Sequence, residues 1–362
     1  MYVVTNREIE PRRDGLDVFG GEPNRRGPNE LRFVKVERQN GDWRMEVIPD
    51  HIPVSGARAL RDRFSLDIDP RAFRQGSLQV ACDIYGQARS EGRNVVIYVH
   101  GYNNDLRDIV ETAERIEQDY GAICLVFSWP ASGGGMVSGT AAFLVDKTDA
   151  RVSMDALTRF VGKLEIYTQK FMQSMQAQLW MEAESHHPDN PERARALYAE
   201  LFYKQCETKL SLVCHGMGNY VLRCALEFNS SMLERFVFDN VVLLAADVDN
   251  ECHAGWVEKI KVRNRLYITI NEADRALNWP RSELVDQVPP QLGAHRKNLV
   301  ARNAYYIDVT RTKGVGEAHG YFVDDAVKEN AALKAFFLAA FNGGRAEDAL
   351  LYEVDSNAYR VP

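Results

Sequence analysis

The chain has 362 residues, of which 45% are hydrophobic, and a formal net charge of −7. This composition is typical of a globular protein with enough apolar material for a buried core, and the acidic balance argues against a nucleic-acid-binding protein, which usually carries a basic face. No apolar run approaches the roughly 20 residues needed to span a bilayer, and the first residues show no secretory signal, so we expect no membrane span and a cytoplasmic location.

Cysteine usage agrees with this expectation. The six cysteines are scattered along the chain without a C-x-x-C pair, so we interpret them as reduced, mostly buried thiols. No clustered His, Cys and Asp spacing indicates a metal site, and we expect neither a metal nor another cofactor.

The first ninety residues differ in pattern from the rest. Residues 2–5 form a short candidate strand, and residues 31–37 and 43–48 alternate apolar and polar side chains on either side of a polar turn, which predicts a β-hairpin. Residues 71–89 are expected to be helical. We predict that residues 1–90 form an appendage packed on the core.

From residue 93 onward, short apolar runs alternate with amphipathic segments. The runs are rich in Val, Ile and Leu, as strands covered by helices on both faces need to be: 94–99, 122–127, 210–214, 240–245, 265–270 and 304–309. Helices are expected between and after them, at 106–120, 151–181, 191–206, 217–228 and 326–341. This alternation predicts an α/β domain over residues 91–342 with a mostly parallel central sheet and helices on both faces, followed by a C-terminal tail at 343–362.

A helical insertion is expected at about residues 131–206. The stretch Ser132-Gly133-Gly134-Gly135 leads into the long helix, which suggests a lid with the glycines as its hinge. The alternative is an elongated crossover helix packed on the sheet. We favour the alternative, because an apolar stripe at helical spacing mostly reports core packing.

The most informative stretch is residues 210–222, which contains His215-Gly216-Met217-Gly218-Asn219. An apolar strand, a sharp turn and a helix follow one another there, as in the G-x-S-x-G elbow that presents a nucleophilic serine to a carbonyl. Gly216 stands at the place of the serine. The amide of Met217 is a candidate donor to the oxyanion that forms during acyl transfer.

Three other polar segments follow predicted strands. His100-Gly101-Tyr102-Asn103-Asn104 follows the strand at 94–99, where serine hydrolases place a second oxyanion donor, here the Tyr102 amide. Asp274 follows the strand at 265–270 and His319 follows the strand at 304–309. Along the chain, the nucleophile position comes first, then Asp274 and then His319. This is the order of Ser, Asp and His in the catalytic triad of the α/β-hydrolase fold.

Each of these residues also has a structural interpretation. His100 and His215 flank glycine turns, and we favour hydrogen bonding to local backbone over catalysis for both. Asp274 could cap a turn, with Asp247 and Asp249 as rival acids.

Taken together, these residues resemble a bacterial family of α/β-hydrolases of poorly defined function, related to esterases and lipases. The resemblance covers about residues 93–322 and is carried by the segments 99–103, 127–130 and 215–219, by Asp274, and by His319-Gly320-Tyr321-Phe322. It implies hydrolysis of an ester or similar acyl bond in a small-molecule substrate, without metal or cofactor. The residues assigned to substrate binding are His100, Gly101, Asn103, Trp129 and His215. Oligomeric state does not follow from it.

Two departures from the family pattern lie in the elbow, where Cys214 replaces the first glycine and Gly216 replaces the serine. The second has three explanations: a natural loss that leaves a binding protein, a substitution in an otherwise ordinary serine hydrolase, or chemistry by a water that His319 activates. Cys214 as a substitute nucleophile is the least favoured option, because it is expected to be buried in the strand. A binding module, with the N-terminal segment as interaction surface, remains the rival to an enzyme.

Overall fold

The computed structural model describes residues 1–10, 13, 15–131, 140–205, 208–229, 231–278 and 289–362. The chain divides into two compact units, one of residues 1–47, 94–160 and 209–362 and the other of residues 48–93 and 161–208. The predicted glycine hinge at 132–135 and Cys206 lie outside the described residues.

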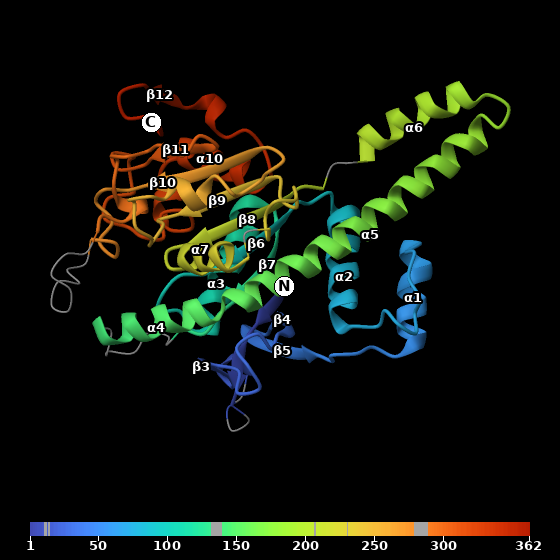
Figure 1. Ribbon diagram of the computed structural model, residues 1–362, viewed down its shortest axis with the longest axis horizontal. Helices are drawn as coiled ribbons and strands as arrows, with labels where there is room; N and C mark the ends of the chain where they lie inside the picture. Colours follow the sequence, from blue (N-terminus) through green and yellow to red (C-terminus); the bar gives the residue numbers. More distant parts are fainter. Residues whose placement is uncertain (11–12, 14, 132–139, 206–207, 230, 279–288) are drawn as a thin grey trace. The chain divides into compact units, whose positions relative to one another are not determined.

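The first unit contains a large sheet with the strand order β12-β13-β11-β10-β9-β8-β6-β7-β1-β4-β5 (Figure 1). Every neighbouring pair from β13 to β1 is parallel. The central strands are β6 (Val95–Val99), β7 (Ile123–Ser128), β8 (Leu210–His215), β9 (Asn240–Leu244), β10 (Arg265–Ile270) and β11 (Ala304–Asp308). The predicted α/β fold class, with its mostly parallel sheet, is confirmed.

The N-terminal residues are part of this sheet, which corrects the predicted appendage of residues 1–90. Strand β1 (Tyr2–Thr5) pairs in parallel with β7 and antiparallel with β4 (Arg32–Gln39), and β5 (Asp42–Ile48) extends the edge beyond β4. Asn40 and Gly41, between β4 and β5, have φ values of 54° and 89°, as a two-residue type I′ hairpin turn requires. A separate small sheet contains β2 (Arg7–Ile9) and β3 (Phe19–Pro23), with the short helix η1 (Gly15–Val18) before β3.

The C-terminal residues also join the sheet instead of forming a tail. Strand β13 (Ala358–Arg360) pairs in parallel with β11, and β12 (Leu351–Glu353) pairs antiparallel with β13. The connection between β13 and the preceding helix contains the short helix η3 (Glu347–Ala349).

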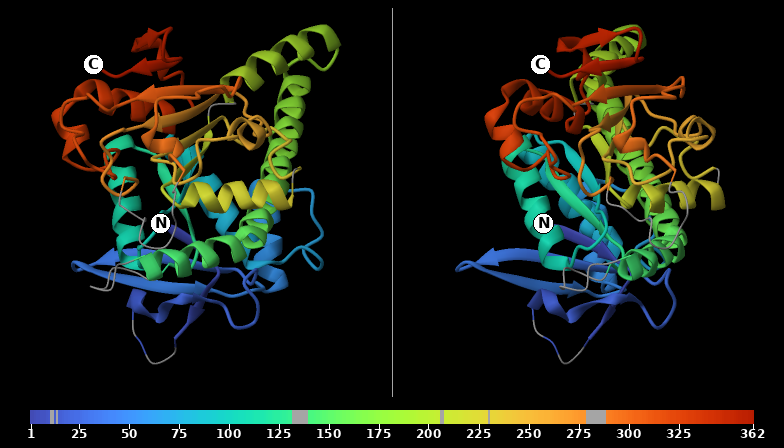
Figure 2. Two further views of the ribbon diagram at one scale, coloured as in Figure 1. Left: turned by 60° about the vertical axis from the view of Figure 1, so that its left-hand side comes forward. Right: turned by 90° about the vertical axis from the view of Figure 1, so that its left-hand side faces the viewer.

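Helices cover both faces of the sheet in the first unit. Helices α3 (Leu106–Tyr120) and α10 (Ala331–Phe341) bury their apolar sides in one continuous core with strand residues such as Tyr98, Val213 and Tyr267. Helix α7 (Gly218–Phe228), which follows β8, lies on the opposite face (Figure 2). The remaining helices of this unit are α4 (Thr140–Val152), α8 (Ala254–Val257), η2 (Leu292–Ala294) and α9 (Asp325–Glu329). The central strands are buried because both faces are covered.

The second unit is helical. It contains α1 (Val54–Phe64), α2 (Gly76–Glu91), α6 (Pro191–Gln205) and most of α5 (Met154–His186). Its core joins Tyr167 and Phe171 of α5 to Leu66, Leu78 and Cys82. This part of α5 therefore packs on helices of its own unit, which differs from the crossover packing on the sheet that we favoured from the sequence. Helix α1 was not predicted, because most of its residues are polar. Only a few of them, such as Leu60 and Phe64, pack against the apolar core of this unit.

Among the described residues, no helix combines the length and the apolar character that a membrane crossing needs.

Candidate active site

The elbow after β8 is held by backbone bonds on both sides of Gly216. The Gly216 amide donates to the Leu244 carbonyl at 3.0 Å, and the Gly216 carbonyl accepts from the Asp247 amide at 3.1 Å and from Asn219 Nδ2 at 3.0 Å. Gly216 has a φ of +52°, in the left-handed region that favours glycine. The turn therefore has the sharp, fixed geometry expected of a nucleophile elbow, without a side chain at its apex.

The loop after β6 approaches the elbow closely because glycines face each other. A Cβ at Gly218 would lie 2.6 Å from the carbonyl oxygens of both Val99 and His100, so only glycine fits there. A Cβ at Gly101 would lie 3.6 Å from Gly216 Cα. The two loops predicted to carry the oxyanion donors, 100–104 and 216–218, are thus brought together.

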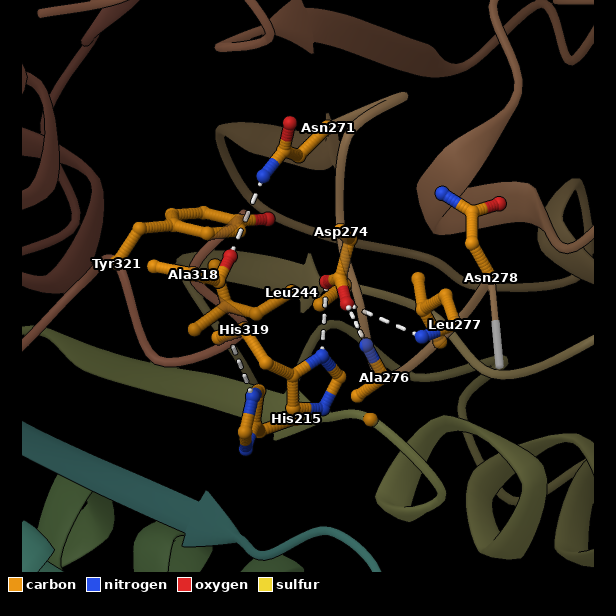
Figure 3. A network of polar contacts seen from close by, with 12 residues as sticks. His215, Leu244, Asn271, Asp274, Ala276, Leu277, Asn278, Ala318, His319 and Tyr321 are labelled. Carbon is orange, nitrogen blue, oxygen red and sulfur yellow. Dashed lines mark hydrogen bonds and ion pairs between the residues drawn. The ribbon is translucent and has the colours of Figure 1, made fainter. Parts of the chain in front are cut away.

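Asp274 and His319 form a hydrogen-bonded pair beside the elbow (Figure 3). His319 Nδ1 donates to Asp274 Oδ2 at 2.8 Å, while Asp274 Oδ1 accepts from the amides of Ala276 and Leu277 at 2.9 and 3.1 Å. The Asp274 side chain is fully buried, and 28% of the His319 side chain is exposed. Asp249, one of the rival acids, is paired instead with Arg223 at 3.4 Å. The predicted contact between Asp274 and His319 is therefore present.

Asn271 positions the loop that carries His319, a role that the sequence analysis did not assign. Its Nδ2 donates to the carbonyls of Gly316 and Ala318 at 3.0 and 3.2 Å, directly before His319. Its place at the end of β10, three residues before Asp274, was the available signal. The side chain joins the acid loop to the histidine loop and so fixes the distance between the two members of the pair.

The imidazole of His319 faces the apex of the elbow. A Cβ built at Gly216 would lie 2.9 Å from His319 Nε2 and 3.6 Å from its Cε1. The ring nitrogen that does not contact Asp274 therefore points to the position where this fold carries its nucleophile.

His215 packs against His319 and forms a hydrogen bond with its backbone. Its Nε2 donates to the His319 carbonyl at 3.2 Å, and the two ring centroids are 4.4 Å apart. Burial, with a smaller contribution from His319, holds the pKa of His215 well below its usual value. His215 is therefore a neutral neighbour of His319, and its almost complete burial favours positioning over the predicted contact with substrate.

His100 and Trp129 are also structural, which corrects their assignment to substrate binding. Both side chains are fully buried, and their rings stack with centroids 5.0 Å apart. Trp129 Nε1 donates to the His100 carbonyl, His100 Nδ1 donates to the Gly101 carbonyl, and His100 Nε2 accepts from the Trp129 amide. The two residues clamp the end of β6 to the end of β7 and leave no surface for a ligand.

The loop of residues 100–104, the oxyanion loop, contacts helix α4. This contact was not predicted from the sequence. Asn103, with a φ of +57°, donates from its amide to Asp146 Oδ2 at 3.2 Å, and the Tyr102 ring lies 5.7 Å from Phe143. In the elbow, the Met217 amide donates to no acceptor among the described residues. That amide is thus available to a ligand, as an oxyanion donor must be.

The described residues favour neither a cysteine nucleophile at position 214 nor a metal centre. Cys214 is fully buried, and burial raises the pKa of its thiol well above the usual range, so it is unsuited to act as a nucleophile. No group of three or more His, Cys, Asp or Glu side chains among the described residues could hold a metal ion.

Comparison with known proteins identifies the family. The model of the alpha/beta hydrolases of unknown function (DUF900) matches residues 83–186 and 190–331. The chain belongs to this family. Neither a curated protein nor a solved structure matches this chain. In this α/β-hydrolase, the matched residues include the elbow, Asp274 and His319.

Arg7 lies before the matched region, yet it binds the loops that surround the candidate site. The fully buried guanidinium donates to Ser128 Oγ at 2.9 Å and to the carbonyls of Asn104, Ala131 and Gly20 at 2.8, 3.0 and 3.1 Å. Burial lowers the pKa of Arg7 to about 10, which leaves it charged at neutral pH. The fork shape of arginine allows one side chain to join these four acceptors.

Replacing Arg7 with lysine is therefore expected to destabilise the protein. A lysine keeps the charge but cannot reach all four acceptors, so buried carbonyls lose their partners, and the free energy of unfolding should fall by about 3 kcal/mol. Chemical denaturation measures this change. Arg302→Lys, at an exposed position, is the matched control and should shift stability by less than about 0.5 kcal/mol. Equal effects of the two substitutions would contradict the role given to Arg7.

The buried His100 should make the stability of this α/β-hydrolase-family protein depend on pH. Burial lowers the pKa of His100 to about 3, compared with about 6.5 in an unfolded chain. The unfolded state therefore binds a proton that the folded state excludes, and stability present above pH 6.5 is lost as the pH falls toward 3. Between pH 7 and pH 5 the loss from His100 should be about 2 kcal/mol.

Thermal melts at these two pH values measure the effect. In His100→Phe the stacking on Trp129 can persist, and although the variant is less stable, its melting temperature should depend less on pH than that of the unsubstituted protein. An unchanged pH dependence would show that His100 is not the titrating group.

Proposed function

We propose that this chain is a hydrolase of the esterase and lipase type that acts on an ester or related acyl bond, with Gly216 at the nucleophile position of its Ser-Asp-His triad. The observation that carries the proposal is the hydrogen-bonded pair of Asp274 and His319, whose free ring nitrogen faces the elbow. Such a pair is the acid–base part of an acyl-transfer site.

The remaining roles follow from the same arrangement. His319 acts as the base, Asp274 holds it in the tautomer with a proton on Nδ1, and the amides of Met217 and Tyr102 receive the oxyanion. With a nucleophilic atom at the elbow, these groups suffice to transfer an acyl group to the protein and then to water. The proposed substrate is therefore a small acyl compound, and the reaction requires no cofactor.

A catalytically inactive binding or interaction protein is the second candidate, and Gly216 itself favours it. Glycine adopts a φ of +52° without the steric penalty that a serine meets there, so loss of the hydroxyl stabilises the elbow while it removes covalent catalysis. The rest of the site would then bind an acyl group without cleaving it.

A fluorophosphonate probe tests the proposal, because it reacts readily with a serine that a neighbouring base activates. We expect Gly216→Ser to be labelled and the unsubstituted protein to remain unlabelled. Gly216→Ala introduces the same Cβ without the hydroxyl and is the matched control. Adding His319→Ala to Gly216→Ser should abolish labelling.

A folded Gly216→Ser protein that resists the probe would contradict the proposal and favour the binding protein. Cooperative thermal unfolding of the variant establishes that it is folded.

A further inference from the structure

The imidazole of His319 lies so close to the elbow that a side chain at position 216 would require the ring to shift. Its Nε2 would lie only 2.9 Å from a Cβ at Gly216, a separation below that of ordinary non-bonded contacts. The same Cβ would lie 3.5 Å from Gly101 Cα, so the ring nitrogen and the oxyanion loop border the same point. His319 therefore fills part of the space that a serine side chain would need.

The nitrogen at this point carries a lone pair. Because Asp274 Oδ2 accepts the hydrogen bond from His319 Nδ1, the proton of the neutral ring is on Nδ1 and Nε2 is bare. Asp274 is itself held by the amides of Ala276 and Leu277, so turning the ring would break its hydrogen bond to a carboxylate that is fixed in place.

The surroundings of the ring favour attack by this lone pair. His215, kept neutral by burial, lies against the ring and adds no positive charge that would make the Nε2 lone pair less nucleophilic. The Met217 amide, which has no acceptor among the described residues, belongs to the elbow that Nε2 faces. A nucleophile and an oxyanion donor are thus both provided without a serine.

We infer that His319 Nε2 is itself the nucleophile of this site and forms an acyl-imidazole intermediate. The inference rests on the proposed function, because it assumes an acyl substrate bound at the elbow. It differs from that proposal in the attacking atom, which belongs to the histidine instead of to a water or a restored serine.

The reaction balances without a further reagent. The Nε2 lone pair forms a bond to the carbonyl carbon, and the carbonyl π electrons move to the oxygen. When the carbonyl re-forms, the bond to the leaving group breaks and its electron pair departs with that group. Because Nδ1 keeps its proton, the acylated ring is a cation whose charge the Asp274 carboxylate balances. Water then attacks the acyl carbon and gives up one proton to the released anion or to solvent, the C–N bond returns its electrons to Nε2, and the carboxylic acid leaves.

This chemistry selects the substrate class. In a serine hydrolase the histidine donates a proton to the leaving group, but an acylated Nε2 has no proton to give. The leaving group must therefore depart as a stable anion, as the phenolate of an aryl ester or the thiolate of a thioester does. Alkyl esters, which release a strongly basic alkoxide, should not react.

The experiment uses the unsubstituted protein with p-nitrophenyl acetate, rapid acid quenching and peptide mass spectrometry, together with stopped-flow detection of p-nitrophenolate. We expect an acetyl group on His319 and a burst of product close to the protein concentration. His319→Ala and the more conservative His319→Gln should lose both signals. His186→Ala, at an exposed position on α5, is the control and should keep both.

The other outcomes separate this inference from the proposed function. Hydrolysis without an acetylated His319 and without a burst overturns the inference in favour of water activation. An inert unsubstituted protein with an active Gly216→Ser variant also overturns it, and leaves the proposed function standing. If neither protein reacts with aryl esters or thioesters, both are overturned.

Discussion

Gly216→Ser is expected to raise kcat/KM for short p-nitrophenyl esters by about 10³-fold or more over the unsubstituted protein. The base, the residue that orients it and the oxyanion donors are already arranged around the elbow, and the substitution adds an alkoxide-forming oxygen next to His319 Nε2. An alkyl ester should become a substrate as well, because His319 is then free to protonate the leaving group. Initial-rate assays with matched aryl and alkyl esters measure both effects.

The same substitution should lower the melting temperature. A side chain at a φ of +52° costs about 1 kcal/mol or more, and the added Cβ, 2.9 Å from Nε2, requires His319 to move by a few tenths of an ångström. Gly216→Ala imposes the same strain and is the matched control: it should melt as low as Gly216→Ser and gain no activity.

A folded Gly216→Ser protein without ester hydrolysis would contradict the catalytic interpretation of the elbow. Equal gains from serine and alanine would show that the hydroxyl is not the attacking group.

The site could be predicted from the sequence because its residues follow strands. In a parallel sheet the carboxyl ends of neighbouring strands meet at one edge, so Gly216, Asp274 and His319, each located after a predicted strand, were expected to converge. The strands themselves were recognisable from continuous apolar runs, and β6 and β8 lie in one sheet, where they are parallel neighbours. Local patterns therefore predicted the framework and the residues that meet at its edge.

The edges of the sheet could not be predicted in this way. Strand β1 lies between β7 and β4, although more than 100 residues separate it from β7 in the chain. Its three apolar residues carry no information about their partner. The burial of the Arg7 guanidinium could not be predicted either, because it depends on four acceptors from other segments of the chain.

The short distance between His319 and the elbow is a further property that no pattern contains. It depends on the positions of three loops to within tenths of an ångström, and it decides whether the lone pair of Nε2 meets a hydroxyl, a water or the substrate itself. Sequence motifs name the members of such a site but do not give this separation.

Asp274→Asn, introduced together with Gly216→Ser, is expected to reduce kcat by about 10⁴-fold relative to Gly216→Ser alone. The asparagine carbonyl oxygen can still accept from the amides of Ala276 and Leu277, so its NH₂ group faces His319 Nδ1. A donor at that position forces the proton onto Nε2, which leaves no lone pair to act as a base. The variant should fold normally, since the side chain keeps its shape.

Asp249→Asn is the matched control, because Asp249 also follows a strand but pairs with Arg223, and it should leave kcat within about twofold. If Asp249→Asn reduces kcat as strongly as Asp274→Asn, Asp274 is not the residue that orients the histidine.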